Sequence, residues 1–167
     1  MPSQDAGISI VPFTPEYTAS VISLIVSIQR EEFGLAITSQ DQPDLHDVPD
    51  FYQTGRGNFW IALYQGSVVG SIALLDIGHN QAALRKMFVQ REFRGSTHGT
   101  ARLLLTTLLD WAKAHQVSEI YLGTTAKFLA AHRFYEKNGF TEISKSQLPA
   151  QFPVMNVDTK FYRYGVA

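Results

Sequence analysis

Apolar residues recur along the chain at two spacings, one typical of strands and one typical of helices. Short runs rich in valine, isoleucine, leucine and aromatic residues predict strands over residues 8–13, 58–64, 67–76, 82–89, 118–122, 140–143 and 159–164. Apolar residues three or four positions apart predict helices over 16–33, 99–115 and 127–138. Residues 38–53 are polar with two prolines and are expected to form a short helix and a loop.

Glycines mark the ends of several of these elements. Gln65-Gly66 is a hairpin signal between two strands, and Gly34 and Gly139 are expected to end helices. Three consecutive strands followed by alternating helices and strands predict a mixed sheet with helices on both faces. The fold class is therefore α/β (α+β), with one domain over residues 1–167.

Composition narrows the classes of function. The 167 residues contain no cysteine, which excludes disulfides, thiolate metal sites and a cysteine nucleophile. The net charge of −1 provides no general field for nucleic acid or an anionic membrane. The N-terminus lacks a signal-peptide pattern, and no apolar run approaches the roughly 20 residues that span a bilayer. A soluble, cytoplasmic protein without nucleic-acid or membrane partners is expected.

The segment QREFRGSTHG joins a predicted strand to a predicted helix. Gly95 and Gly99 allow a sharp turn, Arg94 supplies a cation, and the helix start supplies unpaired N–H groups. Together they predict a site for a phosphate group. The alternative is a helix that starts in a glycine turn beside a solvated arginine. The GK[ST] ending of a P-loop and the G-x-G-x-x-G pattern are both absent.

Two segments resemble motifs of the Gcn5-related N-acetyltransferase (GNAT) superfamily. The run MFVQREFRGSTHGTARLL is similar to that family's acyl-CoA-binding segment, R-G-x-G-x-G, with Thr97 where the central glycine is usual. The run AAHRFYEKNGF is similar to the later motif A-x-x-F-Y-E-K-x-G-F. Its matching positions are Ala131, Phe134, Tyr135, Glu136, Lys137, Gly139 and Phe140. Phe128 stands where the family commonly has asparagine.

The resemblance implies the acyl-CoA N-acyltransferase fold and acetyl-CoA as the cosubstrate. Backbone groups of Met87, Phe88 and Val89 would contact the pantetheine arm. The pyrophosphate would lie on the turn formed by Arg94, Gly95, Ser96, Thr97, His98, Gly99 and Thr100. Phe128, Ala131, Phe134 and Lys137 would border the cofactor, although Phe134 also fits the core and Lys137 also fits a solvated surface.

The same resemblance gives Tyr135 the role of general acid, which protonates the leaving thiolate; the alternative is a core tyrosine packed beside Phe134. The base is less well marked, because strand 82–90 contains no carboxylate. Glu32 and Asp76 are the first candidates, followed by Glu31, Asp41 and Asp44. Ordinary solvated charge is the alternative for each of them.

The acceptor is expected to meet the first helix, the loop after it and the ends of the strands. Arg85 and Lys86 are adjacent on a strand, so only one of them is expected to face the cleft. A cation there would suit an acceptor with a carboxylate, such as an amino acid or a small peptide; pairing with an acid on a neighbouring strand explains the charges equally well. The five histidines show no metal-ligand spacing, so no metal is expected.

The sequence therefore predicts an enzyme that transfers acetyl from acetyl-CoA to a primary amine of a small molecule, amino acid or peptide. A non-catalytic acyl-CoA-binding or sensing module is the first alternative, motivated by Thr97 and Phe128. An interaction domain that has lost coenzyme A is the second. The resemblance is also compatible with a homodimer.

Overall fold

The computed structural model describes residues 7–166 except 96, 127 and 156. In this part of the chain one seven-stranded sheet has the order β1-β2-β3-β4-β5-β7-β6. The strands are β1 Ser9–Pro12, β2 Asn58–Tyr64, β3 Ser67–Gly78, β4 Gln81–Val89, β5 Glu119–Thr124, β6 Thr141–Ile143 and β7 Lys160–Gly165. The α-helices are α1 Thr18–Ser27, α2 Val48–Phe51, α3 Thr100–Ala114 and α4 Leu129–Lys137. The predicted fold class is confirmed.

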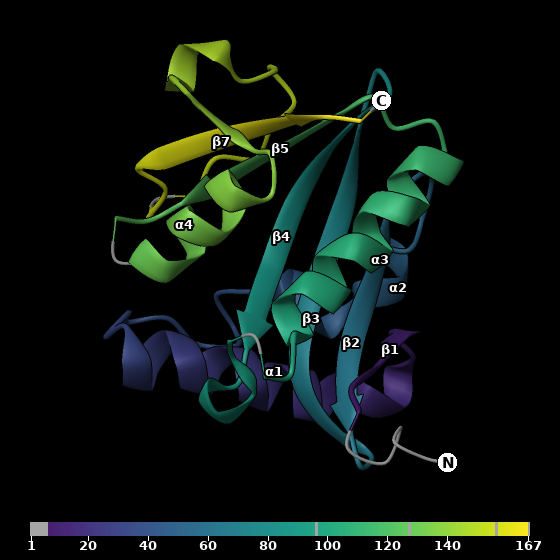
Figure 1. Cartoon of the computed structure of the whole chain (residues 1–167), viewed down its shortest axis with the longest axis vertical. Helices are drawn as coiled ribbons and strands as arrows, with labels where there is room; N and C mark the ends of the chain where they lie inside the picture. The colour runs from purple at the N-terminus through teal and green to yellow at the C-terminus, as the bar shows by residue number, and fades with distance from the viewer. Residues whose placement is uncertain (1–6, 96, 127, 156, 167) are drawn as a thin grey trace.

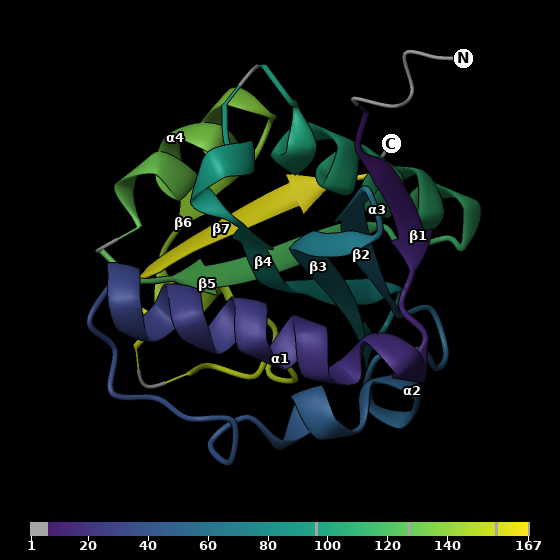
Figure 2. The same ribbon diagram turned by 90° about the horizontal axis from the view of Figure 1, so that it is seen from below.

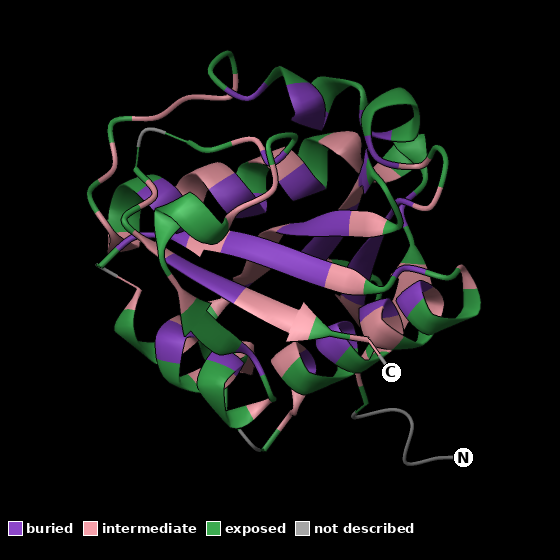
Figure 3. Cartoon of the chain, turned by 90° about the horizontal axis from the view of Figure 1, so that it is seen from above, coloured by how far each residue is buried: buried purple, intermediate pink, exposed green. Residues whose placement is uncertain are grey.

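The helices cover the sheet from both sides. Figure 2 shows α1 and α2 on one face, with α3 and α4 on the other. The side chains of α3 pack against β2 and β3 in one core, while α1 and α2 close a second core around Tyr52 and Phe59. Buried residues accordingly follow the central strands and the inner stripes of the helices (Figure 3). No described helix is both long enough and apolar enough to cross a membrane.

The glycine signals of the sequence have the expected local structure. Gln65 and Gly66 both have positive φ, 50° and 83°, as a tight two-residue hairpin requires. Gly139 has a φ of +94°, and the N–H of Phe140 donates to the oxygen of Tyr135 at 3.0 Å, so α4 ends as predicted. The predicted first helix differs, because its last part, Ile28–Glu32, is π-helical. The predicted start of the last helix, Lys127, lies outside the described residues.

The sheet opens between its two parallel strands. β4 and β5 pair only through Gln81–Ala83 and Glu119–Tyr121, while β5 pairs along its whole length with β7 on its other edge. Figure 1 shows β4 and β5 converging at one end and separating toward the other. The second half of β4 therefore has one backbone edge free of strand pairing with β5. The opening thus lies beside Met87, Phe88 and Val89, whose backbone groups the sequence resemblance assigns to the pantetheine arm.

Candidate active site

The turn between β4 and α3 has the backbone that its glycines predict. Gly95 and Gly99 have φ angles of +90° and +63°, which glycine adopts without strain. A Cβ added at either glycine would meet no atom within 4 Å, so space is open beside the turn. Gly99 immediately precedes α3, so the N–H groups and partial positive charge of the helix start adjoin this space. Ser96, predicted for the same turn, lies outside the described residues.

Arg94, the predicted cation of this turn, is held from two sides. Its Nε donates to the backbone oxygen of Val89 at 2.7 Å, and its Nη1 lies 2.8 Å from Oε1 of Glu32. Glu32 ends the π-helical segment after α1 and also lies 3.7 Å from Arg91. The guanidinium is therefore fixed beside the glycine turn, with part of its charge neutralised by Glu32.

The other predicted residues of the turn differ in exposure. Thr97 is exposed, whereas the His98 ring packs 5.0 Å from the ring of Phe93. Thr100 and Thr124 are buried, and within the described chain their hydroxyls are the only buried side-chain polar atoms without a hydrogen-bond partner. Thr124 ends β5 beside the opening in the sheet, and Thr100 begins α3 after the glycine turn. Buried polar groups normally have partners, which makes these two positions candidates for contact with a ligand.

The predicted pantetheine contacts form the end of β4. Phe88 and Val89 pair with Ser71 and Gly70 of β3, and β5 forms no ladder with this part of the strand. Met87 packs against the core on the α3 side, while Phe88 packs on the α1 side. One backbone edge of these three residues is thus paired with β3, and the other edge faces the opening.

The ring of Tyr135 packs in the core, whereas its hydroxyl has no hydrogen-bond partner among the described residues. It is 5% exposed, and its ring centroid lies 5.5 Å from that of Phe140 and 6.0 Å from that of Tyr162. Among the described residues, none forms a hydrogen bond with its hydroxyl. Burial raises the pKa of this phenol, so it keeps its proton throughout the neutral range. The ring therefore fits the core alternative, and the hydroxyl keeps its capacity to donate to a ligand.

The remaining predicted cofactor contacts lie on or beside α4. Phe128, which precedes the helix, has its ring centroid 4.4 Å from that of Phe33. Ala131 and Phe134 are partly buried against the core, and Lys137 is exposed in the last turn. Phe128 therefore forms a hydrophobic contact at the position where the resembled motif has a polar side chain.

A cleft lies on the α1 side of the opening. Its walls are β4 from Leu84 to Phe88, the end of β5 from Gly123, the segment around Gln42, and the loop from Phe152 to Asp158. Its volume is about 120 Å³, whereas pockets for drug-sized ligands are roughly 300–1,000 Å³. The cleft is therefore suited to a small ligand.

Both Arg85 and Lys86 line this cleft, so the prediction that only one of them faces it is wrong. The reason is a β-bulge. Ser71 and Ala73 of β3 pair with Phe88 and Arg85, which leaves an extra residue on β4, and Lys86 has a φ of +55°. A bulge interrupts the alternation of side chains along a strand and redirects them.

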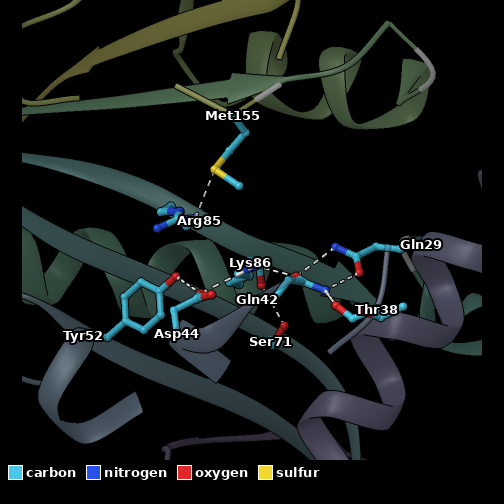
Figure 4. Close-up of polar contacts among 9 residues, drawn as sticks. All are labelled: Gln29, Thr38, Gln42, Asp44, Tyr52, Ser71, Arg85, Lys86 and Met155. Atoms are coloured by element: carbon cyan, nitrogen blue, oxygen red, sulfur yellow. Dashed lines mark hydrogen bonds and ion pairs between the residues drawn. The ribbon is translucent and has the colours of Figure 1, made fainter. Parts of the chain in front are cut away.

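A buried polar network forms the floor of the cleft (Figure 4). The Lys86 Nζ donates to Oε1 of Gln42 at 2.6 Å and lies 3.5 Å from Oδ2 of Asp44. The Tyr52 hydroxyl donates to the same Asp44 oxygen at 2.5 Å, and Gln42 exchanges hydrogen bonds with Gln29. Burial lowers the pKa of Lys86 to about 8, opposed by the neighbouring Asp44 charge. Asp44, one of the weaker base candidates, is thus committed to Lys86 and Tyr52.

The two carboxylates predicted first as the base lie elsewhere. Glu32 is paired with Arg94 on the turn side, and it does not line the cleft. Asp76 accepts hydrogen bonds from the N–H of Arg56 at 2.9 Å and of Gly78 at 2.8 Å, which fixes the loop before β2. We therefore set both aside as the base, because ion pairing and turn formation occupy their carboxylates.

Asp158 is a cleft residue that sequence reasoning missed. It precedes β7, and one carboxylate oxygen accepts from the N–H of Met155 at 2.9 Å. A Cβ added to Gly123 of β5 would come 2.6 Å from that oxygen, so glycine is needed for the carboxylate to lie against the strand. Burial raises the Asp158 pKa, while the charge of Arg85 lowers it. No local pattern marks Asp158, because only the pairing of β7 with β5 brings it to the opening.

In the described ranges, no group of three histidine, aspartate or glutamate side chains is placed to hold a metal ion.

Comparisons with known proteins agree on one family. The profile of the acetyltransferase (GNAT) family matches residues 22–140. A solved acetyltransferase of the GNAT family from Staphylococcus aureus is 36% identical, with a TM-score of 0.92 over 96% of this chain and 100% of that one. The PaiA N-acetyltransferase of Thermoplasma acidophilum, solved in complex with coenzyme A, shares the fold at 17% identity, with a TM-score of 0.72 over 95% of this chain and 99% of that one.

Among curated proteins, the N-acetylaspartate synthetase of Danio rerio is 36% identical over 106 residues. The match covers 62% of this chain and 37% of that protein, so the chain spans little more than a third of this relative's length.

Proposed function

The chain belongs to the acetyltransferase (GNAT) family, and from this premise we propose that it transfers the acetyl group of acetyl-CoA to a primary amine of a small acceptor. The observation that carries the proposal is the opening between β4 and β5. A glycine turn at a helix start adjoins the opening, and a small charged cleft lies on its α1 side. A donor and an acceptor can thus approach one another through the sheet.

The residues present fit acetyl-CoA. Bound there, it supplies an activated acetyl thioester. The N–H groups of Gly95, Thr97, His98 and Thr100 and the fixed Arg94 would hold its pyrophosphate, each dipole contact contributing roughly 0.3–1 kcal/mol. The Gly99 N–H already donates to the oxygen of Gly95 at 3.1 Å. The hydroxyls of Thr100, at the start of α3, and Thr124, at the end of β5, have no partner among the described residues and are further possible donors. The edge of Met87–Val89 that is not paired with β5 would hold the pantetheine amides, apart from the Val89 oxygen, which already accepts from Arg94.

The reaction requires proton transfer at both the attacking nitrogen and the departing sulfur. The acceptor nitrogen needs a free lone pair, so it must lose a proton before it attacks. The departing sulfur must gain one, and Tyr135 is the proposed donor, because its hydroxyl keeps its proton and has no partner among the described residues. The acceptor is proposed to attack the thioester directly in a ternary complex, and the chain contains no cysteine that could carry the acetyl group.

The acceptor is proposed to be small, with an amino acid as the first candidate. The cleft volume supports this size, and the name of the N-acetylaspartate synthetase relatives points to an amino acid as the amine. Because the chain spans only part of those relatives, this similarity supports the chemical class of the acceptor more than its identity.

A non-catalytic acyl-CoA-binding module is the second candidate. One observation favours it: Phe128 makes a hydrophobic contact where the resembled motif has a polar residue. The two candidates are separated by measuring thiol release from acetyl-CoA with a panel of amines and by thermal shift with coenzyme A. Stabilisation together with turnover supports the enzyme. Stabilisation without turnover on any amine supports the module, and no stabilisation at about millimolar coenzyme A contradicts both.

Replacing Glu32 by glutamine tests whether this residue neutralises Arg94 or acts as the base. Because the ion pair is partly exposed, releasing Arg94 is worth about 0.2–1 kcal/mol, so coenzyme A should bind up to about five-fold more tightly. Turnover should not fall. The measurements are the Kd for coenzyme A by calorimetry and kcat by thiol release. A loss of turnover of about 10²-fold or more would instead restore Glu32 as the base.

A further inference from the structure

Arg85 is a cleft cation that the fold leaves without a counter-charge. Arg91, Arg94 and Arg163 each form an ion pair with a glutamate, but among the described residues Arg85 forms none. Its guanidinium lies 5.8 Å and 5.9 Å from the ring centroids of Phe51 and Tyr52, and 3.6 Å from the sulfur of Met155. These contacts hold the group in place and leave most of its N–H donors unused.

Lys86, the second cleft cation, is already satisfied. Its ammonium contacts Asp44 and Gln42, and its side chain is only 7% exposed. Asp44 is fixed in turn by the Tyr52 hydroxyl, and Tyr52 presents its ring toward Arg85. The Lys86 network therefore supports the wall on which Arg85 lies, and Arg85 is the cation available to a ligand.

Asp158 is available on the other wall of the same cleft. One of its oxygens accepts from the N–H of Met155, and within the described residues no partner engages the other. Its contact with Gly123 places it at the end of β5, where the sheet opens. Arg85 and Asp158 influence each other electrostatically but form no ion pair. A cation and an anion thus line one small cleft with space for a ligand that carries both charges.

We infer that the acceptor is a zwitterion whose carboxylate binds Arg85 and whose amine binds Asp158. This rests on the proposed function and names the class of its acceptor. Asp158 also accepts the ammonium proton. The nitrogen–carbon bond to the acetyl group then forms, the carbon–sulfur bond breaks, and the nitrogen loses its second proton to water. The sulfur takes the phenol proton of Tyr135, which water replaces. Asp158 passes the proton that it accepted to water, so the carboxylate is restored and one proton is released per turnover.

The test pairs acceptors with variants. Thiol release from acetyl-CoA is measured with free amino acids, with the same compounds amidated at each carboxyl group, and with simple alkylamines. Arg85→Gln should raise the KM for the acids by about 10- to 100-fold, the usual worth of a charged hydrogen-bonded contact, and should change the KM for their amides little. Arg163→Gln, which alters an ion pair far from the cleft, is the matched control.

Asp158→Asn should lower kcat/KM about 10²- to 10⁴-fold for acids and amides alike, since both carry the amine whose proton Asp158 accepts. Asp110→Asn, at an exposed position on α3, is its control, and urea unfolding verifies that each variant is folded. Arg85→Lys should restore part of the preference for acids. The inference is overturned if wild-type protein acetylates acids and amides equally, or if Arg85→Gln weakens both equally. No thiol release with any amine would instead refute the proposed function.

Discussion

Replacing Tyr135 by phenylalanine is expected to lower turnover by roughly 10²- to 10⁴-fold while leaving the affinity for coenzyme A nearly unchanged. The substitution removes only a hydroxyl that has no hydrogen bond to other described residues. The ring, which packs against Phe140 and Tyr162, remains in place. Protein stability should therefore change by less than about 0.5 kcal/mol, so lost turnover would report lost proton donation. Stopped-flow thiol release and calorimetric coenzyme A binding measure the two quantities.

Tyr162→Phe is the matched control for this experiment. Tyr162 is a buried tyrosine next to Tyr135, but its hydroxyl donates to Glu136 at 2.6 Å. Its removal should leave turnover within about three-fold of wild type, because that phenol is already engaged. Near-wild-type turnover of Tyr135→Phe, with the chemical step shown to limit the rate, would exclude Tyr135 as the acid.

Replacing Asp44 by alanine should destabilise the protein by about 3–5 kcal/mol, because it leaves the Lys86 ammonium buried without its counter-charge. Both side chains are only 7% exposed, and the Tyr52 hydroxyl loses its acceptor in the same variant. Urea unfolding followed by tryptophan fluorescence measures the loss. Asp47→Ala, at an exposed position in the same segment, should cost less than about 0.5 kcal/mol.

The destabilisation should depend on pH with a definite sign. The Lys86 pKa is lowered in the folded protein, to about 8 from 10.5, so the unfolded chain binds more protons between these values and stability from this group rises with pH. Removing Asp44 lowers the pKa further. The loss in Asp44→Ala should therefore be largest near pH 7 and smaller near pH 9.5. Adding Lys86→Met should recover much of it; a double variant as unstable as Asp44→Ala would disprove the pairing.

The sequence by itself determined the elements and the turn at the cofactor side. Gly95 and Gly99 have positive φ in the turn that the pattern places before a helix, and Gly139 has it where a helix ends. The bounds of β2 are those predicted. Such features follow from local sterics and hydrophobic periodicity, which a few neighbouring residues fix. The two motifs that resemble the GNAT superfamily are short and continuous, so the family and the fold class could be predicted from them.

Only the tertiary structure decided which charged side chains line the cleft proposed for the acceptor. The bulge at Lys86 depends on the pairing of β4 with β3, and it places Arg85 and Lys86 together in the cleft. Asp158 reaches Gly123 because β7 inserts beside β5, and Glu32 meets Arg94 across 62 positions of the chain. A charged side chain looks the same in sequence whether it is solvated, paired or unpaired. Its role depends on the distance and burial of distant partners, which folding alone sets.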